Sequence, residues 1–297
     1  CPNLCMQSCT RAKLDRPLGI DQLGRLALDL PAPKKADPTG HTIAVIGGGP
    51  SGLSAAWQLG LKGHTVDLYE ATDKLGGKLE LCIPRERLPQ EVLQKELSRF
   101  REIGVTVHFN AKTDQKQFEE IYKSHEIVVV ACGAHKPRIF QFPGSKHIVS
   151  AYDFLKGINF GDIPTLNNKK VVIIGAGNVG MDVASQAYNC GAQSVIAVDI
   201  QKPAAFGKEM ETALAKGTQI LWPKFSDRYD HSEKKLYFKD GTSLEADLVV
   251  MSVGDIPILD FLPPNIHTER GWIAVNEIGQ TSDVKVFAIG DATRLGL

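Results

Sequence analysis

Two glycine-rich turns, each set between a strand-like and a helix-like segment, constrain the fold of this chain most strongly. The first, Gly47-Gly48-Gly49-Pro50-Ser51-Gly52, follows the β-branched run TIAVIGG and opens the small-residue segment SGLSAAWQLGLKG. The second, Gly175-Ala176-Gly177-Asn178-Val179-Gly180, follows KVVIIGA and opens NVGMDVASQAYNCGA. A further strand pattern comes after each helix, so the sequence predicts two βαβ units.

Each glycine of a G-x-G-x-x-G turn has a physical task. The first permits the tight turn, the second lets the backbone approach a pyrophosphate, and the third lets the helix pack closely on the strand. The N-terminus of the helix offers unpaired N–H groups and a partial positive charge to the phosphates. Glu70 and Asp199 close the second strand of the two units and would accept hydrogen bonds from ribose hydroxyls. Glycines that serve packing alone are the weaker interpretation, because strand, turn, helix and acidic residue occur in the required order in both units.

The residue at position 199 also bears on the choice of nicotinamide cofactor. A carboxylate there binds the 2′-hydroxyl of NAD and repels the 2′-phosphate of NADP. Sites that prefer NADP usually place arginine nearby, whereas the stretch AVDIQKPAAFGKE offers only Lys202 and Lys208. The sequence therefore favours NAD(H) over NADP(H).

Composition narrows the possible partners and location. The chain has 297 residues, 43% of them apolar, and no formal net charge. This length allows two modest domains with separate cores, and the balanced charge gives no reason to expect nucleic acid or an anionic membrane as partner. The longest apolar runs are too short to cross a bilayer, and the N-terminus lacks the regions of a signal peptide. We expect a cytoplasmic protein whose cysteines are reduced.

The segment KVFAIGDA links the two units to a known group of enzymes. With its strand ending at Gly290-Asp291, the sequence resembles the two-dinucleotide-domain flavoprotein reductases, which hold the ribityl chain of FAD with this Gly-Asp pair. The resemblance implies an α/β fold of two Rossmann-like domains, with FAD bound by the first unit and NAD(P) by an inserted domain. The expected divisions are residues 1–40 for the remnant of an N-terminal iron–sulfur domain and a linker, 41–138 with 249–297 for the FAD domain, and 139–248 for the NAD(P) domain.

The resemblance also implies further contacts with the cofactors. Gly76-Gly77 matches a glycine pair that lies against the flavin, VVVACGA matches the strand that leaves the FAD domain, and VVMSVGDIP matches the strand that returns. Arg85 and Arg87 fall in a segment near the flavin, although the start of a surface helix is an open alternative. The cofactor-binding residues predicted beyond the two turns, their acidic residues and Gly290-Asp291 are Gly77, Lys78, Arg87, Ala131, Gly133 and Gly254.

Three cysteines near the N-terminus carry a closer resemblance. Cys1, Cys5 and Cys9, with RPLGIDQLGRLALD, GGKLELCIPRERLP and GAGNVGMDVA, make the whole chain similar to the small subunit of glutamate synthase and to the homologous region of dihydropyrimidine dehydrogenase. The resemblance implies a helical remnant of a domain that holds two [4Fe-4S] clusters. A cubane normally needs four protein ligands, so a cluster is expected only in the full-length protein. A zinc half-site, or no metal at all, stays open for these cysteines.

The predicted protein is an oxidoreductase module that passes hydride from NADH to FAD. Electrons would then leave singly to iron–sulfur clusters, and onward to a larger catalytic subunit or domain, or to a ferredoxin-like acceptor. The chain ends at Leu297, seven residues from Gly290, so we expect the helix that completes the flavin site to be missing and FAD affinity to be lowered. Two alternatives are a dinucleotide-binding scaffold without turnover and a stand-alone disulfide reductase. No Cys-x-x-Cys lies within the nucleotide-binding segments, which argues against the reductase.

Overall fold

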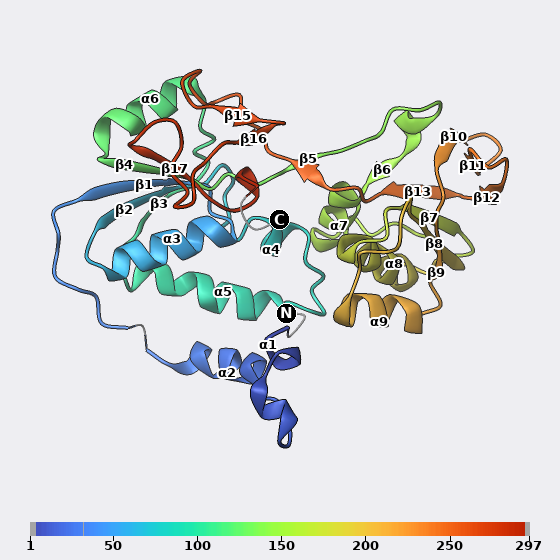
Figure 1. The fold of residues 1–297 in the computed structure, drawn as a ribbon, viewed down its shortest axis with the longest axis horizontal. Helices are drawn as coiled ribbons and strands as arrows, with labels where there is room; N and C mark the ends of the chain where they lie inside the picture. The colour runs from blue at the N-terminus through green and yellow to red at the C-terminus, as the bar shows by residue number, and fades with distance from the viewer. Residues whose placement is uncertain (1–3, 32, 295–297) are drawn as a thin grey trace. The chain divides into compact units, whose positions relative to one another are not determined.

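A computed structural model describes residues 4–31 and 33–294, and the chain divides into two compact units. The outer unit holds residues 33–136 and 255–294. The chain thus leaves this unit once and later returns to it. The inserted unit holds residues 137–254, with which residues 4–31 are grouped. Each unit is built on its own five-stranded sheet (Figure 1). The α/β class predicted from the two turns is confirmed.

The sheet of the outer unit is parallel, in the order β17-β4-β1-β2-β3. Its strands are β1 (Thr42–Ile46), β2 (Thr65–Tyr69), β3 (Thr106–His108), β4 (Ile127–Val130) and β17 (Val286–Ala288). Helices cover both faces (Figure 1), so central strands such as β1 are almost wholly apolar. Leu53 of α3 packs with Val45 on one face, and Phe118 of α6 packs with Ile46 on the other. The helices of the unit are α3 (Pro50–Leu61), α4 (Lys78–Leu81), α5 (Gln90–Ser98) and α6 (Gln115–Ser124), and a short ladder joins β15 (Thr268–Glu269) to β16 (Trp272–Ile273).

The sheet of the inserted unit repeats this plan in the order β6-β13-β7-β8-β9, again parallel. Its strands are β6 (Val149–Ser150), β7 (Lys170–Ile174), β8 (Ser194–Val198), β9 (Gln219–Leu221) and β13 (Leu248–Met251). One face contacts α8 (Asn178–Asn189), which lies between α7 (Ala151–Asn159) and α9 (Gly207–Ala215). The other face packs on an antiparallel sheet of β10 (Ser226–Asp230), β11 (Lys235–Phe238) and β12 (Ser243–Glu245), through Tyr229, Leu236 and Phe238.

The observed division differs from the expected one at three points. Residues 249–254 belong to the inserted unit, because β13 pairs with both β7 and β6 and is as buried as any central strand. The chain therefore returns to the outer unit at Asp255, and it leaves that unit after Lys136. At these crossings β5 (Lys136–Pro137) and β14 (Asp255–Ile256) form a two-stranded ladder. Residues 33–40, expected to be a linker, belong to the outer unit, where Lys35 donates to the carbonyl of Ile103.

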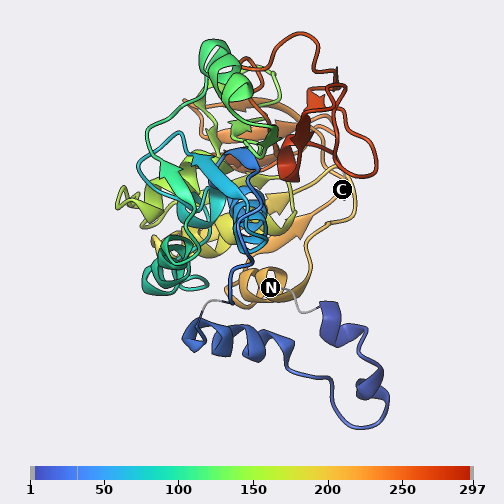
Figure 2. The ribbon, with the colours of Figure 1, turned by 90° about the vertical axis from the view of Figure 1, so that its left-hand side faces the viewer.

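Residues 4–31 form short helical turns joined by irregular chain (Figure 2). They are α1 (Leu4–Gln7), η1 (Thr10–Lys13), α2 (Ile20–Leu26) and η2 (Ala27–Asp29). This agrees with the helical remnant that the resemblance implies, although Leu23 and Leu26 are exposed. No helix among the described residues is long and apolar enough to span a bilayer.

Candidate functional site

Backbone contacts close the first glycine-rich turn and leave no room for side chains at two of its glycines. Gly47 has a φ of +111°, and a Cβ there would lie 2.4 Å from the carbonyl oxygen of Ala131. A Cβ on Gly52 would lie 1.9 Å from the carbonyl oxygen of Gly47. Gly49 is open by comparison, since its Cβ would meet only the Cα of Gly77, at 3.9 Å. At Gly47 and Gly52 the backbone thus leaves no space for a side chain, and Gly49 stays accessible to a ligand, as the glycine pattern requires.

Glu70 fixes the same turn from the end of β2. Its side chain is buried, and its Oε2 accepts the backbone N–H of Gly48 at 2.9 Å. Its Oε1 accepts the N–H and the hydroxyl of Thr72, both at 2.8 Å. A carboxylate has about four acceptor sites, so Glu70 holds the turn and keeps capacity for one more donor such as a ribose hydroxyl.

The second turn has the same construction. A Cβ on Gly175, whose φ is +108°, would lie 2.2 Å from the carbonyl oxygen of Ser252, and a Cβ on Gly180 would lie 2.2 Å from that of Gly175. Gly177 has nothing within 4 Å of its Cβ position. Asp199 accepts the N–H of Ala176 at 2.8 Å through Oδ2, which matches the bond between Glu70 and Gly48.

Each turn lies at the point where the strand order of its sheet reverses. In the outer sheet β1 lies between β4 and β2, and Gly47 contacts Ala131, just beyond the end of β4. In the inserted sheet β7 lies between β13 and β8, and Gly175 contacts Ser252, just beyond the end of β13. Open α/β sheets bind ligands at such switch points, outside the carboxyl ends of the strands.

Two segments distant in sequence meet the first turn. A Cβ on Gly77, whose φ is +52°, would lie 2.8 Å from the Cα of Gly49, so the Gly76-Gly77 pair rests against the open part of the turn. A Cβ on Gly290 would lie 2.3 Å from the hydroxyl of Ser51. The fold therefore brings Gly77, Ala131 and Gly290 together with the first turn.

Lys78 extends this group with a partner that was not predicted. Its ammonium lies 2.7 Å from the carboxylate of Asp255 and 3.9 Å from that of Asp291. His135, which follows Gly133 beyond β4, is half-buried in the same region. Burial, and next the charge of Lys78, lower the pKa of His135. Asp255 and His135 stand outside every glycine motif, so only their positions after β13 and β4 would have marked them in the sequence.

Asn178, predicted to bind the cofactor, also has a contact within the chain. Its side-chain oxygen accepts the N–H of Phe206 at 3.0 Å, and its side-chain nitrogen donates to the carbonyl of Phe206 at 3.3 Å. Ala205 donates to the carbonyl of Ala176 at 3.1 Å. Asn178 thus fastens the segment after Asp199 to the second turn, and its side-chain amide is already used for this contact. Val179, the next residue of the turn, is 52% exposed.

The other predicted contacts are less closely grouped. Arg87 is exposed in the loop after α4. Arg85 pairs instead with the buried Glu80 at 3.3 Å. Gly254, with a φ of +89°, accepts the N–H of Arg138 and lies in the inserted unit, where it takes the place that Gly133 has after β4.

Two of the three predicted metal ligands can be described, since Cys1 lies outside the described residues. Cys5 on α1 is exposed, whereas Cys9 follows the end of α1 and precedes η1, so the two do not share one helical face. Backbone N–H groups of Leu18 and then Arg11 hold the pKa of the Cys9 thiol below its ordinary value. Residues 4–31 and 33–294 contain no cluster of three or more histidine, cysteine or acidic side chains able to hold a metal.

Cys5 and Cys132 are expected to differ clearly in the reactivity of their thiols. Burial raises the pKa of Cys132 to about 12, so only about one thiol in ten thousand is a thiolate at pH 8. We expect iodoacetamide at pH 8 to alkylate the exposed Cys5 at least about tenfold faster than Cys132, as measured by peptide mass spectrometry. In urea the two rates should converge. Equal rates in the folded protein would contradict the partial burial of Cys132.

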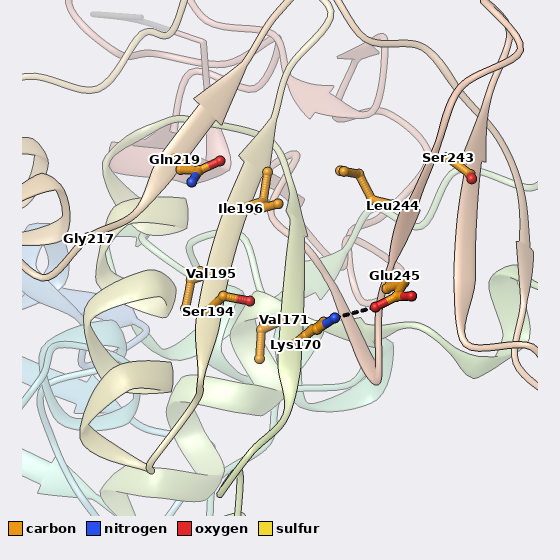
Figure 3. A pocket seen from close by; sticks show the side chains of 10 residues that line it. All are labelled: Lys170, Val171, Ser194, Val195, Ile196, Gly217, Gln219, Ser243, Leu244 and Glu245. Atoms are coloured by element: carbon orange, nitrogen blue, oxygen red, sulfur yellow. Dashed lines mark hydrogen bonds and ion pairs between the residues drawn. The ribbon is translucent and has the colours of Figure 1, made fainter.

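A cavity of about 320 Å³ lies away from both turns, in the inserted unit. It is bounded by the start of β7, by β8 and by β12, and Figure 3 shows Ile196 and Leu244 facing it across a gap. Lys170 and Glu245 form an ion pair at its edge (Figure 3). Lys170 and Ser194 are the first residues of their strands, so the cavity is at the amino end of the sheet and is separate from the dinucleotide edge.

Comparison with known proteins agrees with this geometry. Residues 41–297 match the model of the pyridine nucleotide-disulphide oxidoreductase family. The chain belongs to this family. It is therefore an oxidoreductase of a flavin- and NAD(P)-dependent class, and the resemblance predicted from the sequence is confirmed.

Three relatives show how far the likeness extends. The NAD-dependent dihydropyrimidine dehydrogenase subunit PreT of Salmonella typhimurium is 31% identical, over 99% of this chain and 75% of that protein. The NADP(+)-dependent formate dehydrogenase subunit beta of Moorella thermoacetica is 28% identical, over 98% of this chain and 50% of that protein. The NADH glutamate synthase of Schizosaccharomyces pombe is 32% identical, over 66% of this chain and 10% of that protein. The chain thus spans between a tenth and three quarters of these relatives.

The fold is also found among solved structures. FprA of Mycobacterium tuberculosis, in complex with NADPH, superposes with a TM-score of 0.69 over 86% of this chain and 79% of that chain. The two sequences are 18% identical, so this likeness concerns the fold alone.

Proposed function

We propose that this oxidoreductase binds FAD in the outer unit and NADH in the inserted unit, and passes hydride from NADH to the flavin. The observation that carries the proposal is the repeated site: two closed glycine turns at switch points, each tied to a carboxylate at the end of the next strand. Each turn opens a helix of 12 residues, whose N-terminal N–H groups suit a pyrophosphate. Hydride transfer needs alignment of two rings and no acid or base from the protein.

FAD is assigned to the outer unit because Gly76-Gly77 and Gly290-Asp291 meet the first turn, and no counterpart of these two segments is described at the second turn. Gly77, Lys78, Ala131, Gly133 and Gly290-Asp291 come from three parts of the chain, and of these Gly77 lies against the open Gly49 and Gly290 against Ser51. When bound, the flavin would supply the two-electron to one-electron conversion that these residues cannot perform themselves. Glu70 would bind the adenosine ribose, Asp291 would face the ribityl hydroxyls, and the backbone of Gly49 and Ser51 would bind the pyrophosphate. The predicted contribution of Arg87 stays part of this proposal.

NADH is favoured over NADPH because of the environment of Asp199. Its oxygens accept the N–H groups of Ala176, at 2.8 Å, and Gln201, at 3.2 Å, so the carboxylate is held at the rim of the second turn. A fixed negative charge there favours a 2′-hydroxyl over a 2′-phosphate. The names of the relatives include both cofactors, so the preference is proposed from this residue.

We further propose that Cys1, Cys5 and Cys9 belong to a [4Fe-4S] site that takes electrons from the flavin. Cys9 accepts backbone N–H groups that stabilise a thiolate, which is the form that binds metal. A cubane uses four protein ligands, so at least one more must come from outside these three residues. A closed zinc site would likewise need a fourth ligand.

A larger partner would hold the final substrate. PreT and the formate dehydrogenase protein are both named as subunits, which supports assembly with a catalytic subunit or a ferredoxin-like acceptor. Cys5, Cys9 and Cys132 are free thiols, as suits a reducing compartment, so a cytoplasmic location stays our expectation.

Anaerobic titration tests the proposed function. We expect saturating NADH to bleach the flavin absorbance of the FAD-loaded protein, and ferricyanide, a one-electron acceptor, to restore it. No bleaching by NADH would favour a scaffold without turnover. Rapid NADH-dependent reduction of a small disulfide, with no reaction with ferricyanide, would favour the disulfide reductase.

A further inference from the structure

If the flavin gives up its electrons one at a time, as the proposed function requires, the proton of the transferred hydride is left at the flavin. The inference drawn from this proton rests on the proposed function. A hydride carries one proton and two electrons, whereas an iron–sulfur cluster or ferricyanide takes electrons only. The balanced reaction is NADH giving NAD⁺, one proton and two electrons. The N–H bond that the hydride forms on the flavin must therefore break when the electrons leave, and its proton needs an acceptor.

Most titratable groups around the first turn are unsuited to this task. Cys132 is a protonated thiol at neutral pH, since burial raises its pKa to about 12. Glu70 already accepts three hydrogen bonds from Gly48 and Thr72. Lys78 is a cation paired with Asp255. His135 is the remaining group in this part of the described structure that changes charge near neutral pH.

His135 lies at the switch point of the outer sheet. The chain passes the end of β4, turns at Gly133 with a φ of +66°, and brings the imidazole back over that glycine. The Nε2 atom of His135 lies 3.3 Å from the position of a Cβ on Gly133, so the ring occupies the space beside this backbone. Gly133 and Ala131 belong to the segment that contacts the first glycine turn. The imidazole is thus placed at the ligand-binding edge of the outer unit.

Four charged groups act on this imidazole from four elements. Lys78 of α4 opposes its protonation, whereas Glu70 after β2, Asp255 of β14 and Asp291 of η5 (Gly290–Ala292) favour it. Burial and Lys78 prevail, so the pKa of His135 is lowered and the ring is neutral at pH 7. A neutral imidazole can accept a proton, and the three carboxylates would stabilise the imidazolium that results.

We propose that His135 is the proton acceptor of the flavin site and takes up the proton that remains when the electrons of the hydride leave singly. With FAD bound, the imidazole of His135 would form a bond to this proton as the bond between the hydrogen and the flavin nitrogen breaks, and both electrons would go to one-electron acceptors. The imidazolium then releases this proton to water. Because the reduced flavin is an anion, its charge also raises the proton affinity of His135 while the electrons are present.

The pH dependence of the flavin midpoint potential tests this independently of turnover. A couple of two electrons and one proton changes by about 30 mV per pH unit, the equivalent of a tenfold change in proton concentration. Uptake of a second proton by His135 doubles this slope between the pKa that His135 has beside oxidised flavin and the higher pKa that it has beside reduced flavin. We expect a steep region near neutral pH in the wild-type protein and a uniform shallow slope in His135→Gln and His135→Asn. His267→Gln, which changes an exposed histidine of the same unit, should keep the steep region.

Stopped-flow measurements on the same variants complete the test. His135→Gln should keep the rate of flavin reduction by NADH within about twofold and slow reoxidation by ferricyanide about 100-fold. Added imidazole should restore part of the reoxidation rate. If FAD binds and NADH reduces it, yet the slope and the reoxidation rate of both His135 variants match the wild type, His135 is not the acceptor. A wild-type protein that NADH does not reduce would instead overturn the proposed function itself.

Discussion

Gly52→Ala is expected to weaken FAD binding strongly while the inserted unit keeps its affinity for NADH. The added Cβ would lie 1.9 Å from the carbonyl oxygen of Gly47, and because the backbone fixes both atoms, no side-chain rotation can relieve this overlap. The start of α3 must then move away from β1, and the N–H groups for the pyrophosphate move with it. We expect FAD affinity to fall about 100-fold or more, which corresponds to about 3 kcal/mol. Flavin fluorescence titration measures this change.

Gly180→Ala is the matching change in the inserted unit and should give the opposite pattern. Its Cβ would lie 2.2 Å from the carbonyl oxygen of Gly175, so we expect bound FAD to persist and NADH to lose the ability to bleach it. Gly60→Ala serves as control, because this glycine of α3 is also buried but its Cβ meets only the side chains of Ile103 and Val105, at 3.2 and 3.3 Å. Loss of NADH binding in Gly52→Ala with FAD retained would reverse the assignment of the two cofactors.

The matching effects of Gly52→Ala and Gly180→Ala follow from the repeated construction of the two turns, which the sequence shows only in part. The glycines and the acidic residues are visible in the sequence because tight turns and close approach demand particular residue types. The equivalence of Ala131 and Ser252 is not visible, since both act through backbone carbonyl groups that any residue has. Gly133 and Gly254 follow them at corresponding places, with φ of +66° and +89°. The repeat therefore extends to the strand beside each turn.

The division of the chain was harder to predict for a related reason. A hydrophobic run such as LVVM shows that β13 is buried but does not show in which sheet. The expectation placed residues 249–254 in the FAD domain, whereas pairing with β7 holds them in the inserted sheet. Parallel strands pair across long sequence separations, and their register depends on tertiary contacts that local pattern does not contain.

Side-chain contacts between segments were also beyond the sequence. Lys78 was predicted as a cofactor contact, but its ion pair with Asp255 joins residues far apart in the chain. Asn178 fits the glycine pattern, yet its amide binds the backbone of Phe206. Long polar side chains reach partners that depend on the fold, so their type indicates capacity for hydrogen bonding and does not identify the partner.

Asp199→Asn is expected to reduce the preference for NADH over NADPH about 100-fold. The amide oxygen can still accept the N–H of Ala176, so the turn keeps its support while the charge is lost. NADH affinity should fall about tenfold, because hydrogen bonds to a charged acceptor are stronger than those to a neutral one. NADPH affinity should rise about tenfold, because a repulsion between the carboxylate and the 2′-phosphate disappears.

The comparison is made by measuring anaerobic flavin reduction over a range of concentrations of each nucleotide. Asp227→Asn removes an exposed carboxylate from the same unit and should leave the ratio unchanged, which separates a contact at the ribose from a general change in surface charge. Raised salt should reduce the increase in NADPH affinity of Asp199→Asn only slightly if the carboxylate of Asp199 and the 2′-phosphate are close in the wild-type protein. A wild-type preference for NADPH, retained in Asp199→Asn, would contradict the position assigned to the ribose and would require another residue to select the nucleotide.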